Sequence, residues 1–232
     1  VKPFLILSFT FFLTRLSPRK ILYIPIHCFL FLMPFVLVFQ QPDLGTSAIY
    51  AIVWISLMLA GGLSLRLAFG AIAGGILGVP MLWKILAEYQ RNRILTFLNP
   101  ALDPTGAGYN AIQSVIAVGS GMIFGRGLGR GTQSHLRFLP EYHTDFIFAT
   151  LVEELGLVGG IVLLGLYAIL LWKLLSPLVT QSIHDIFPYL YSLGVFAMIL
   201  SQMSINISMN MGLIPVTGIT LPITKHNYLI TR

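Results

Sequence analysis

Residues 155–172 read LGLVGGIVLLGLYAILLW, eighteen positions without a single charged side chain. A run of this length and composition approaches the roughly 20 apolar residues that carry a helix across the hydrocarbon core of a bilayer. Similar uncharged runs lie at 21–39, at 46–63, at 67–83 and within 186–224. Because lipid cannot satisfy exposed peptide groups, and because barrel strands would give alternating segments of about ten residues, these runs predict transmembrane helices.

The composition of the whole chain also favours a membrane protein. Of 232 residues, 56% are apolar and 9% are charged, and the mean hydropathy is +0.85. A soluble domain carries about 25% charged residues, so this balance excludes an ordinary soluble globule and a disordered segment. The single cysteine excludes a disulfide-built secreted scaffold. The net charge of +6 is scattered rather than clustered along a face, so no nucleic-acid partner is expected.

We predict an all-α fold, a polytopic transmembrane helix bundle with a long extracytoplasmic loop, formed by one membrane domain over residues 1–232. The spans are expected at about 1–14, 21–39, 46–63, 66–84, 150–173 and 186–209, and the loop at about 85–149. Basic residues in alternate short connections orient the bundle, because such residues favour the cytoplasmic side. These markers are Arg15, Arg19, Lys20, Arg66 and Lys173.

The predicted loop is the part of the chain best suited to chemistry. Ten of the chain's 22 charged residues lie in 84–145, with aromatic residues that argue against disorder, and long ordered loops are usually functional. Near its end, Glu141, His143 and Asp145 stand within five residues at the expected lipid–water boundary. A carboxylate there, partly shielded from water by neighbouring phenylalanines, suits a general base. The alternative is that Asp145 or Thr144 caps the following helix.

Two further motifs each keep two interpretations. Glu153 and Glu154 lie just inside the next span, where acidic residues are costly and are either functional or paired structurally with a basic loop residue. The segment 119–131, GSGMIFGRGLGRG, interleaves glycines with Arg126 and Arg130. Its backbone amides and guanidinium groups could approach a pyrophosphate, or it could be a flexible turn, since the spacing of a nucleotide-binding motif is missing.

Other polar features are predicted to be structural. The connection 41–47 has ordinary turn chemistry, with Asp43 or Thr46 capping the helix that follows. The histidines show no spacing typical of a metal site, and no nucleophile–histidine–acid arrangement is visible in the sequence. The tripeptide Asn206-Ile207-Ser208 lies in an apolar run and is interpreted as a chance match to a glycosylation site.

A series of motifs, taken in order, resembles one protein family. The motifs are Gln41-Pro42-Asp43-Leu44-Gly45-Thr46-Ser47, Tyr89-Gln90-Arg91, Asp103-Pro104, Gly131-Thr132-Gln133-Ser134, His143-Thr144-Asp145-Phe146, Glu153-Glu154-Leu155-Gly156 and Leu213-Ile214-Pro215-Val216-Thr217-Gly218. Together they resemble the SEDS family of bacterial cell-wall proteins (RodA, FtsW and SpoVE), with most similarity to its RodA branch. The resemblance runs from about residue 1 to residue 222.

The resemblance implies a ten-helix glycosyltransferase of the bacterial cytoplasmic (inner) membrane that polymerises lipid II into peptidoglycan glycan strands during cell elongation and shape maintenance. It also implies a class B penicillin-binding protein as transpeptidase partner. The family's essential aspartate, in the His-Thr-Asp-Phe motif, is Asp145 here. The family pattern further implies a fragment. About three N-terminal helices are missing, only Lys2 represents the Pro-Ser-Glu-x-x-Lys motif, and an aberrant tail at 223–232 replaces the C-terminal signature.

The implied reaction moves a growing glycan from undecaprenyl pyrophosphate to the 4-hydroxyl of lipid II. Asp145 would act as the general base that takes the hydroxyl proton. The departing pyrophosphate needs positive charge, from arginines or from a divalent cation, Mg²⁺ or Mn²⁺. The residues expected to bind substrate are Arg91, Arg93, Arg126, Arg130, Glu154 and Lys2. Two other functions stay open, a lipid II flippase and a non-catalytic membrane scaffold for the transpeptidase.

Overall fold

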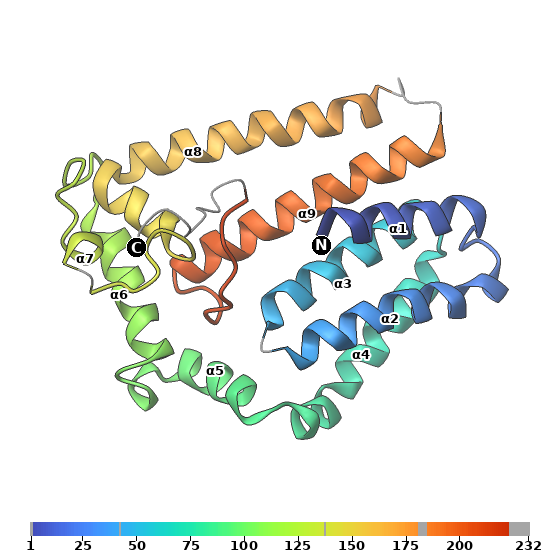
Figure 1. The fold of residues 1–232 in the computed structure, drawn as a ribbon, viewed down its shortest axis with the longest axis horizontal. Coiled ribbons are helices and arrows are strands. Elements are labelled where there is room, and N and C mark those ends of the chain that lie inside the picture. Colours follow the sequence, from blue (N-terminus) through green and yellow to red (C-terminus); the bar gives the residue numbers. More distant parts are fainter. Residues whose placement is uncertain (1, 42, 137, 181–184, 223–232) are drawn as a thin grey trace, which may run out of the picture. The chain divides into compact units, whose positions relative to one another are not determined.

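The structure is a computed structural model that describes residues 2–41, 43–136, 138–180 and 185–222, and over these ranges all regular structure is helical (Figure 1). The α-helices are α1 (Lys2–Arg15), α2 (Ile24–Gln40), α3 (Leu44–Ala60), α4 (Leu65–Ile85), α5 (Glu88–Leu98), α6 (Ala107–Ser120), α7 (Thr132–His135), α8 (Ile147–Val179) and α9 (Ile186–Asn210). Two 3-10 turns, η1 (Ile21–Tyr23) and η2 (Pro100–Leu102), complete the set. The predicted all-α class is therefore confirmed. The predicted aberrant tail at 223–232 lies outside the described residues.

Among the described residues, three helical segments are long and apolar enough to cross a membrane. They are Ile21–Gln40, Ile147–Val179 and Ile186–Asn210, and each overlaps one of the predicted spans. Shorter apolar helices occupy Leu44–Ala60 and Leu65–Gly75. In the segment predicted as the extracytoplasmic loop, the chain forms the short helices α5, η2, α6 and α7. The side of the membrane that each connection faces stays a prediction.

The chain divides into two compact units, and each is described by itself. The first comprises Val1–Ala87 and Leu170–Ser201, and the second comprises Glu88–Ile169 and Gln202–Arg232. The long helices α8 and α9 contribute residues to both units. The single membrane domain expected from the sequence stays a prediction.

In the first unit, α1, α2 and α3 pack against one another (Figure 1). Ile6, Ile49 and Leu57 are almost entirely buried in this packing. Asp43 caps α3, because its Oδ1 accepts the Thr46 N–H at 2.9 Å, which confirms the predicted cap. These three helices therefore pack together mainly through apolar side chains.

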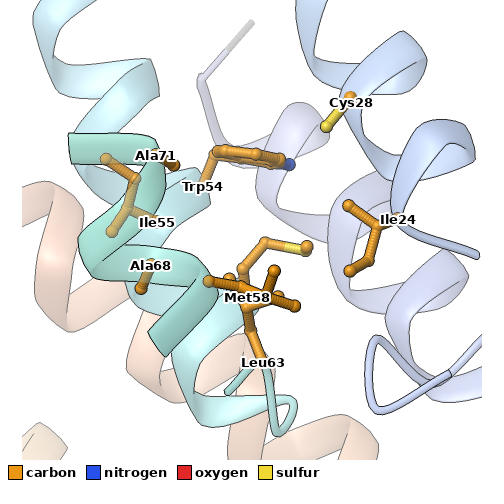
Figure 2. Close-up of a pocket in the computed structure, with 9 residues that line it drawn as sticks. Ile24, Cys28, Trp54, Ile55, Met58, Leu63, Ala68 and Ala71 are labelled. Carbon is orange, nitrogen blue, oxygen red and sulfur yellow. The ribbon is translucent and has the colours of Figure 1, made fainter. Parts of the chain in front are cut away.

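An apolar cavity of about 440 Å³ lies among α2, α3 and α4 in the first unit (Figure 2). Trp54 and Met58 of α3 face it, as do Ile24 of α2 and Ala68 of α4. Its lining carries no ionisable carboxyl, amino or guanidinium group. The cavity therefore offers room for hydrocarbon but no group for acid–base chemistry.

The second unit is built around a small core of buried residues. Ala117 of α6, Leu139 and Phe146 of the loop, and Ala149 at the start of α8 are at most 2% exposed. Before this core, α6 begins at a cap in which Asp103 accepts the N–H groups of Gly106 and Ala107, at 2.9 and 2.7 Å. The core holds the end of the predicted loop against the start of α8, next to Asp145, the predicted general base.

Candidate functional site

The helix α8 is interrupted in its third turn, at Gly156. This residue has φ 70° and ψ −166°, which no helical residue adopts and which an L side chain rarely tolerates. A break of this kind frees peptide groups on both sides, and in a largely apolar surrounding each of them needs a new partner.

The glycine-rich segment supplies those partners. The N–H groups of Arg126 and Gly127 donate to the carbonyl oxygens of Glu153 and Glu154 at 2.9 and 3.0 Å. In return, Leu157 and Val158 donate to the carbonyl oxygens of Met122 and Ile123 at 2.8 and 3.1 Å. This exchange closes the break in α8 with four main-chain hydrogen bonds.

Glycine is required where the two backbones touch. A Cβ on Gly125 would collide with the Glu154 carbonyl, a Cβ on Gly156 with the Gly125 nitrogen and the Ile123 carbonyl, and a Cβ on Gly121 with the Val152 carbonyl. The Gly125, Arg126, Gly127 and Arg130 N–H groups all donate within the chain. These four amides are therefore used within the chain, and the segment forms a backbone patch on the broken helix α8. An approach of the segment to a pyrophosphate stays a prediction.

Glu153 organises the loop that follows this patch. Its side chain has no exposed surface. Its Oε1 accepts from the Gln133 N–H at 2.9 Å and from the Thr132 hydroxyl at 3.3 Å. Its Oε2 accepts from the N–H and the hydroxyl of Ser134 at 3.2 and 3.1 Å. Of the two interpretations left open for the acidic pair, the contacts of Glu153 favour the structural one, with peptide N–H and hydroxyl groups as partners.

The other predicted binding residues of this region lie around Glu153. Arg126 is exposed, and its guanidinium donates to the Ser120 carbonyl at 3.4 Å and to the Thr132 hydroxyl at 3.3 Å. Arg130 is exposed, and Glu154 is half-buried. The structure thus brings Arg126 to the loop that Glu153 holds, and the side chains of Arg126 and Arg130 are both exposed.

Asp145 lies at the end of a tight turn that begins at Glu141. Glu141 has φ 55°, in the left-handed region. Its carbonyl oxygen accepts the N–H groups of Thr144, Asp145 and Phe146 at 3.1, 3.1 and 3.3 Å. The Thr144 hydroxyl donates to the Glu141 carboxylate at 3.1 Å. These bonds fold residues 141–146 back on themselves immediately before α8.

The carboxylate of Asp145 is half-buried beside the segment that follows α9. Its Oδ2 would lie 3.6 Å from a Cβ placed on Gly218, which is itself exposed and has φ 72°. The main-chain carbonyl of Asp145 accepts hydrogen bonds from the side-chain amides of Asn206 and Asn210, at 2.9 and 3.0 Å. The turn and the two buried side-chain amides therefore hold Asp145 through its main chain.

The remaining predicted residues belong to α5 and α1. Arg91 and Arg93 are half-buried on α5, and within the described chain Nη1 of Arg93 is buried without a hydrogen-bond partner. Lys2 begins α1 in the first unit, where it lines a small cleft with Tyr50 and Met198.

Sequence reasoning missed the two asparagines. Asn206 entered only as part of a chance glycosylation match, yet both amides are completely buried in α9. The available signal was their spacing of four residues within an uncharged run of membrane-spanning length, which puts both amides on one face. A polar pair on one face of a membrane helix indicates a packed or functional interior.

Among the described residues, no cluster of three or more His, Cys, Asp or Glu side chains could hold a metal ion. The buried His27 is structural, since its Nε2 lies 2.7 Å from the Leu16 carbonyl oxygen. The need for a divalent cation, Mg²⁺ or Mn²⁺, stays a prediction.

Comparisons with known proteins point to one family. The family model described as cell cycle protein, which covers FtsW, RodA and SpoVE, matches residues 1–225. Peptidoglycan glycosyltransferase MrdB of Escherichia coli K12 is 43% identical over 198 residues, which are 85% of this chain and 53% of MrdB. Stage V sporulation protein E of Bacillus subtilis is 40% identical over 195 residues, 83% of this chain and 51% of that protein.

A solved structure is similar across nearly the whole fold. It belongs to work on the structural coordination of polymerization and crosslinking by a peptidoglycan synthase complex. The match has a TM-score of 0.76 and 29% sequence identity, and it covers 97% of this chain and 62% of the other. The chain spans about half the length of the two curated relatives named above.

Proposed function

Since this chain belongs to the FtsW/RodA/SpoVE family of cell cycle proteins, we propose that it is the core of a peptidoglycan glycosyltransferase that polymerises lipid II during cell elongation and shape maintenance. Its helices of membrane-spanning length support a place in a membrane, and we propose the bacterial cytoplasmic membrane. Relatives carrying the name peptidoglycan glycosyltransferase support the reaction class.

The observation that carries the proposal is the position of Asp145. Asp145 is half-buried two residues before α8, and its Oδ2 lies beside the exposed Gly218. In the proposed step the 4-hydroxyl oxygen of lipid II attacks the anomeric carbon of the growing glycan. The bond from that carbon to the pyrophosphate oxygen breaks, and the pyrophosphate leaves with the electron pair. The hydroxyl proton passes to Asp145, which lowers the barrier because a neutral sugar hydroxyl is a poor nucleophile.

The negative charge on the leaving pyrophosphate calls for cations. Arg126 and Arg130 are exposed in the second unit and are proposed to approach it. Arg91, Arg93, Glu154 and Lys2 stay in the proposal as further substrate contacts. A divalent cation, Mg²⁺ or Mn²⁺, would supply additional positive charge when bound, with the pyrophosphate itself as its main ligand.

We also propose a transpeptidase of the class B penicillin-binding protein type as partner. The similar solved structure belongs to a complex described as coordinating polymerization with crosslinking, which supports this choice. A polymerase and a crosslinking enzyme in one complex would act on the same glycan strand in succession.

The test reconstitutes this chain with a crosslinking-inactive partner in vesicles that carry labelled lipid II, and uses the longer Escherichia coli relative as positive control. A glycosyltransferase makes polymer, a flippase moves label across the bilayer without polymer, and a scaffold does neither. We expect polymer. Asp145→Asn should reduce its rate at least about 100-fold, since general bases contribute roughly 10²–10⁴-fold. Translocation without polymer, or polymer made by Asp145→Asn at the unaltered rate, would contradict the proposal.

Asp43→Asn is the matched control. It makes the same chemical change in a carboxylate that only caps α3, and asparagine caps helices about as well as aspartate. Its polymerisation rate should equal that of the unaltered chain.

A further inference from the structure

Two carboxamides are completely buried in α9, a helix that is otherwise apolar enough to cross a membrane. Asn206 and Asn210 stand four residues apart, so they lie on one face, and neither has exposed surface. A buried amide is costly unless its hydrogen-bonding groups are used. The bonds that these two amides make therefore indicate what they are for.

Every donor of the pair is used. Nδ2 of Asn206 donates to the carbonyl oxygens of Asp145 and Ile219, at 2.9 and 2.6 Å. Nδ2 of Asn210 donates to the same Asp145 carbonyl at 3.0 Å and to the Asn206 carbonyl at 2.8 Å. One carbonyl, that of Asp145, thus receives a hydrogen bond from each asparagine.

The acceptor side of Asn210 extends this arrangement to two more elements. Its Oδ1 accepts the N–H of Ala149 in the first turn of α8 at 3.1 Å, and the hydroxyl of Ser114 in α6 at 3.4 Å. The Ser114 hydroxyl also donates to the Asn210 carbonyl at 2.9 Å. The asparagine pair therefore connects α6, α8 and α9 around the residue that precedes α8 by two positions.

The bonds of the asparagine pair hold two backbone segments near the carboxylate. One set fixes the main chain of Asp145, and the other fixes Ile219, whose neighbour Gly218 lies next to Oδ2 of that carboxylate. The distance between the acid and the backbone beside it is thereby set by Asn206, which donates to both segments at once.

We propose that Asn206 and Asn210 are positioning residues, whose amides hold the Asp145 main chain and the segment beside Gly218 so that the carboxylate is presented in one place. The assignment of Asp145 as the base rests on the proposed function. Asparagine suits the task because it offers two donors from one nitrogen, whereas an ionised aspartate offers none. Displacement of a catalytic group by about 1 Å can reduce a rate roughly 100-fold, so loss of either amide should act on turnover.

The chain contains a matched control on the same helix. Gln202 donates to the Thr220 carbonyl at 2.9 Å, so it makes the same kind of bond to the same following segment without contacting Asp145. Asn206→Ala and Asn210→Ala are therefore compared with Gln202→Ala in the reconstituted polymerisation assay. We expect kcat to fall about 10- to 100-fold in both asparagine variants, with the KM for lipid II changed less than about threefold, and Gln202→Ala to keep the unaltered kcat. Equal kcat values in the three variants would overturn the proposal.

A second measurement does not depend on activity. The N–H groups of Thr144, Asp145 and Phe146 are hydrogen-bonded in the turn, so their hydrogen exchange reports whether that turn is held. We expect Asn206→Ala to accelerate their exchange at least about tenfold, and Gln202→Ala to leave it unchanged. Unchanged exchange in Asn206→Ala would overturn the positioning role.

The two measurements separate the possible failures. If the unaltered chain makes no polymer while the Escherichia coli relative does, the proposed function fails, and the exchange result still decides whether the amides hold the turn. Faster exchange with unaltered kcat would assign the asparagines a purely structural role and overturn the proposal. If Asn206→Ala does not fold, Asn206→Ser, which keeps one hydroxyl donor, is compared with Gln202→Ser in both measurements.

Discussion

Glu153 and Asp145, two acidic residues of the second unit, are held in opposite ways. Glu153 has no exposed surface, and its two carboxylate oxygens accept four hydrogen bonds from the loop at 132–134. Asp145 is half-buried, is anchored through its main-chain carbonyl by two asparagines, and carries its carboxylate beside an exposed glycine. Both are acids at the boundary between loop and apolar helix. The anchoring of Glu153 favours a structural role for its carboxylate, and the anchoring of Asp145 through its main chain is compatible with the proposed chemical role of its side chain.

The strongest way to break the Glu153 region is Gly156→Ala. Alanine at position 156 would have to adopt a positive φ, and its methyl group would collide with the backbone of the glycine-rich segment. The four bonds across the break in α8 then cannot form. A positive φ costs about 1–2 kcal/mol and each lost bond about 1 kcal/mol, so we expect about 4 kcal/mol or more of lost stability. The measurement is the thermal unfolding midpoint in detergent.

Gly165→Ala, in the same helix, is the control, because no atom lies within 4 Å of its Cβ position. It should unfold at or slightly above the unaltered midpoint, since alanine is favoured over glycine in helices. Equal destabilisation by the two substitutions would contradict the role given to the glycine-rich segment.

Glu153→Gln sharpens the comparison. The new amide keeps the size of the side chain but turns a donor toward Ser134, which itself donates to this position. One mismatched buried polar contact costs about 1–3 kcal/mol, so the unfolding midpoint should fall. The kcat of the folded fraction should stay within about threefold of the unaltered value. A loss of kcat comparable to that of Asp145→Asn, at an unchanged midpoint, would make Glu153 a chemical group and remove the distinction.

Arg130→Gln tests the charged surface of the glycine-rich segment. The guanidinium is exposed, so its loss should leave folding unaffected and weaken attraction to a pyrophosphate. We expect the KM for lipid II to rise about threefold to tenfold at low salt, with a smaller effect at high salt because exposed charges are screened. A salt-independent effect on kcat alone would argue against substrate binding by this side chain.

The smallest effect is expected from Asp43→Asn. The substitution keeps an oxygen acceptor for the Thr46 N–H, so stability should change by less than about 0.5 kcal/mol. An unfolding titration of the purified chain measures it. A larger loss would show that the charge of Asp43, and not its capping bond, matters to the first unit.

The sequence was sufficient to predict the long apolar helices, because long uncharged runs allow few structures other than a membrane-spanning helix. It also predicted a helix cap by Asp43 or Thr46, because capping is local, and the structure selects Asp43. The pairing of the glycine-rich segment with the break at Gly156 could not be predicted. Its four bonds join backbone groups about 30 residues apart and leave no pattern in side-chain type beyond the glycines themselves.

The candidate site could be predicted only in part, because its contacts also join residues far apart in the sequence. Asp145 was singled out by its polar surroundings and by family resemblance, whereas its anchors lie 61 and 65 residues further along the chain. Glu153 and Glu154 looked equivalent in sequence, and only burial and hydrogen bonds separate them. The residue type alone therefore does not reveal whether an acidic side chain is held by hydrogen bonds within the fold.

The central claim is tested most directly by measuring lipid II binding and polymerisation on one preparation of Asp145→Asn. The account predicts a dissociation constant within about threefold of the unaltered chain, an unchanged unfolding midpoint, and polymerisation at least about 100-fold slower, since only the proton acceptor is removed. Polymerisation at the unaltered rate, with substrate bound as before, would contradict the account.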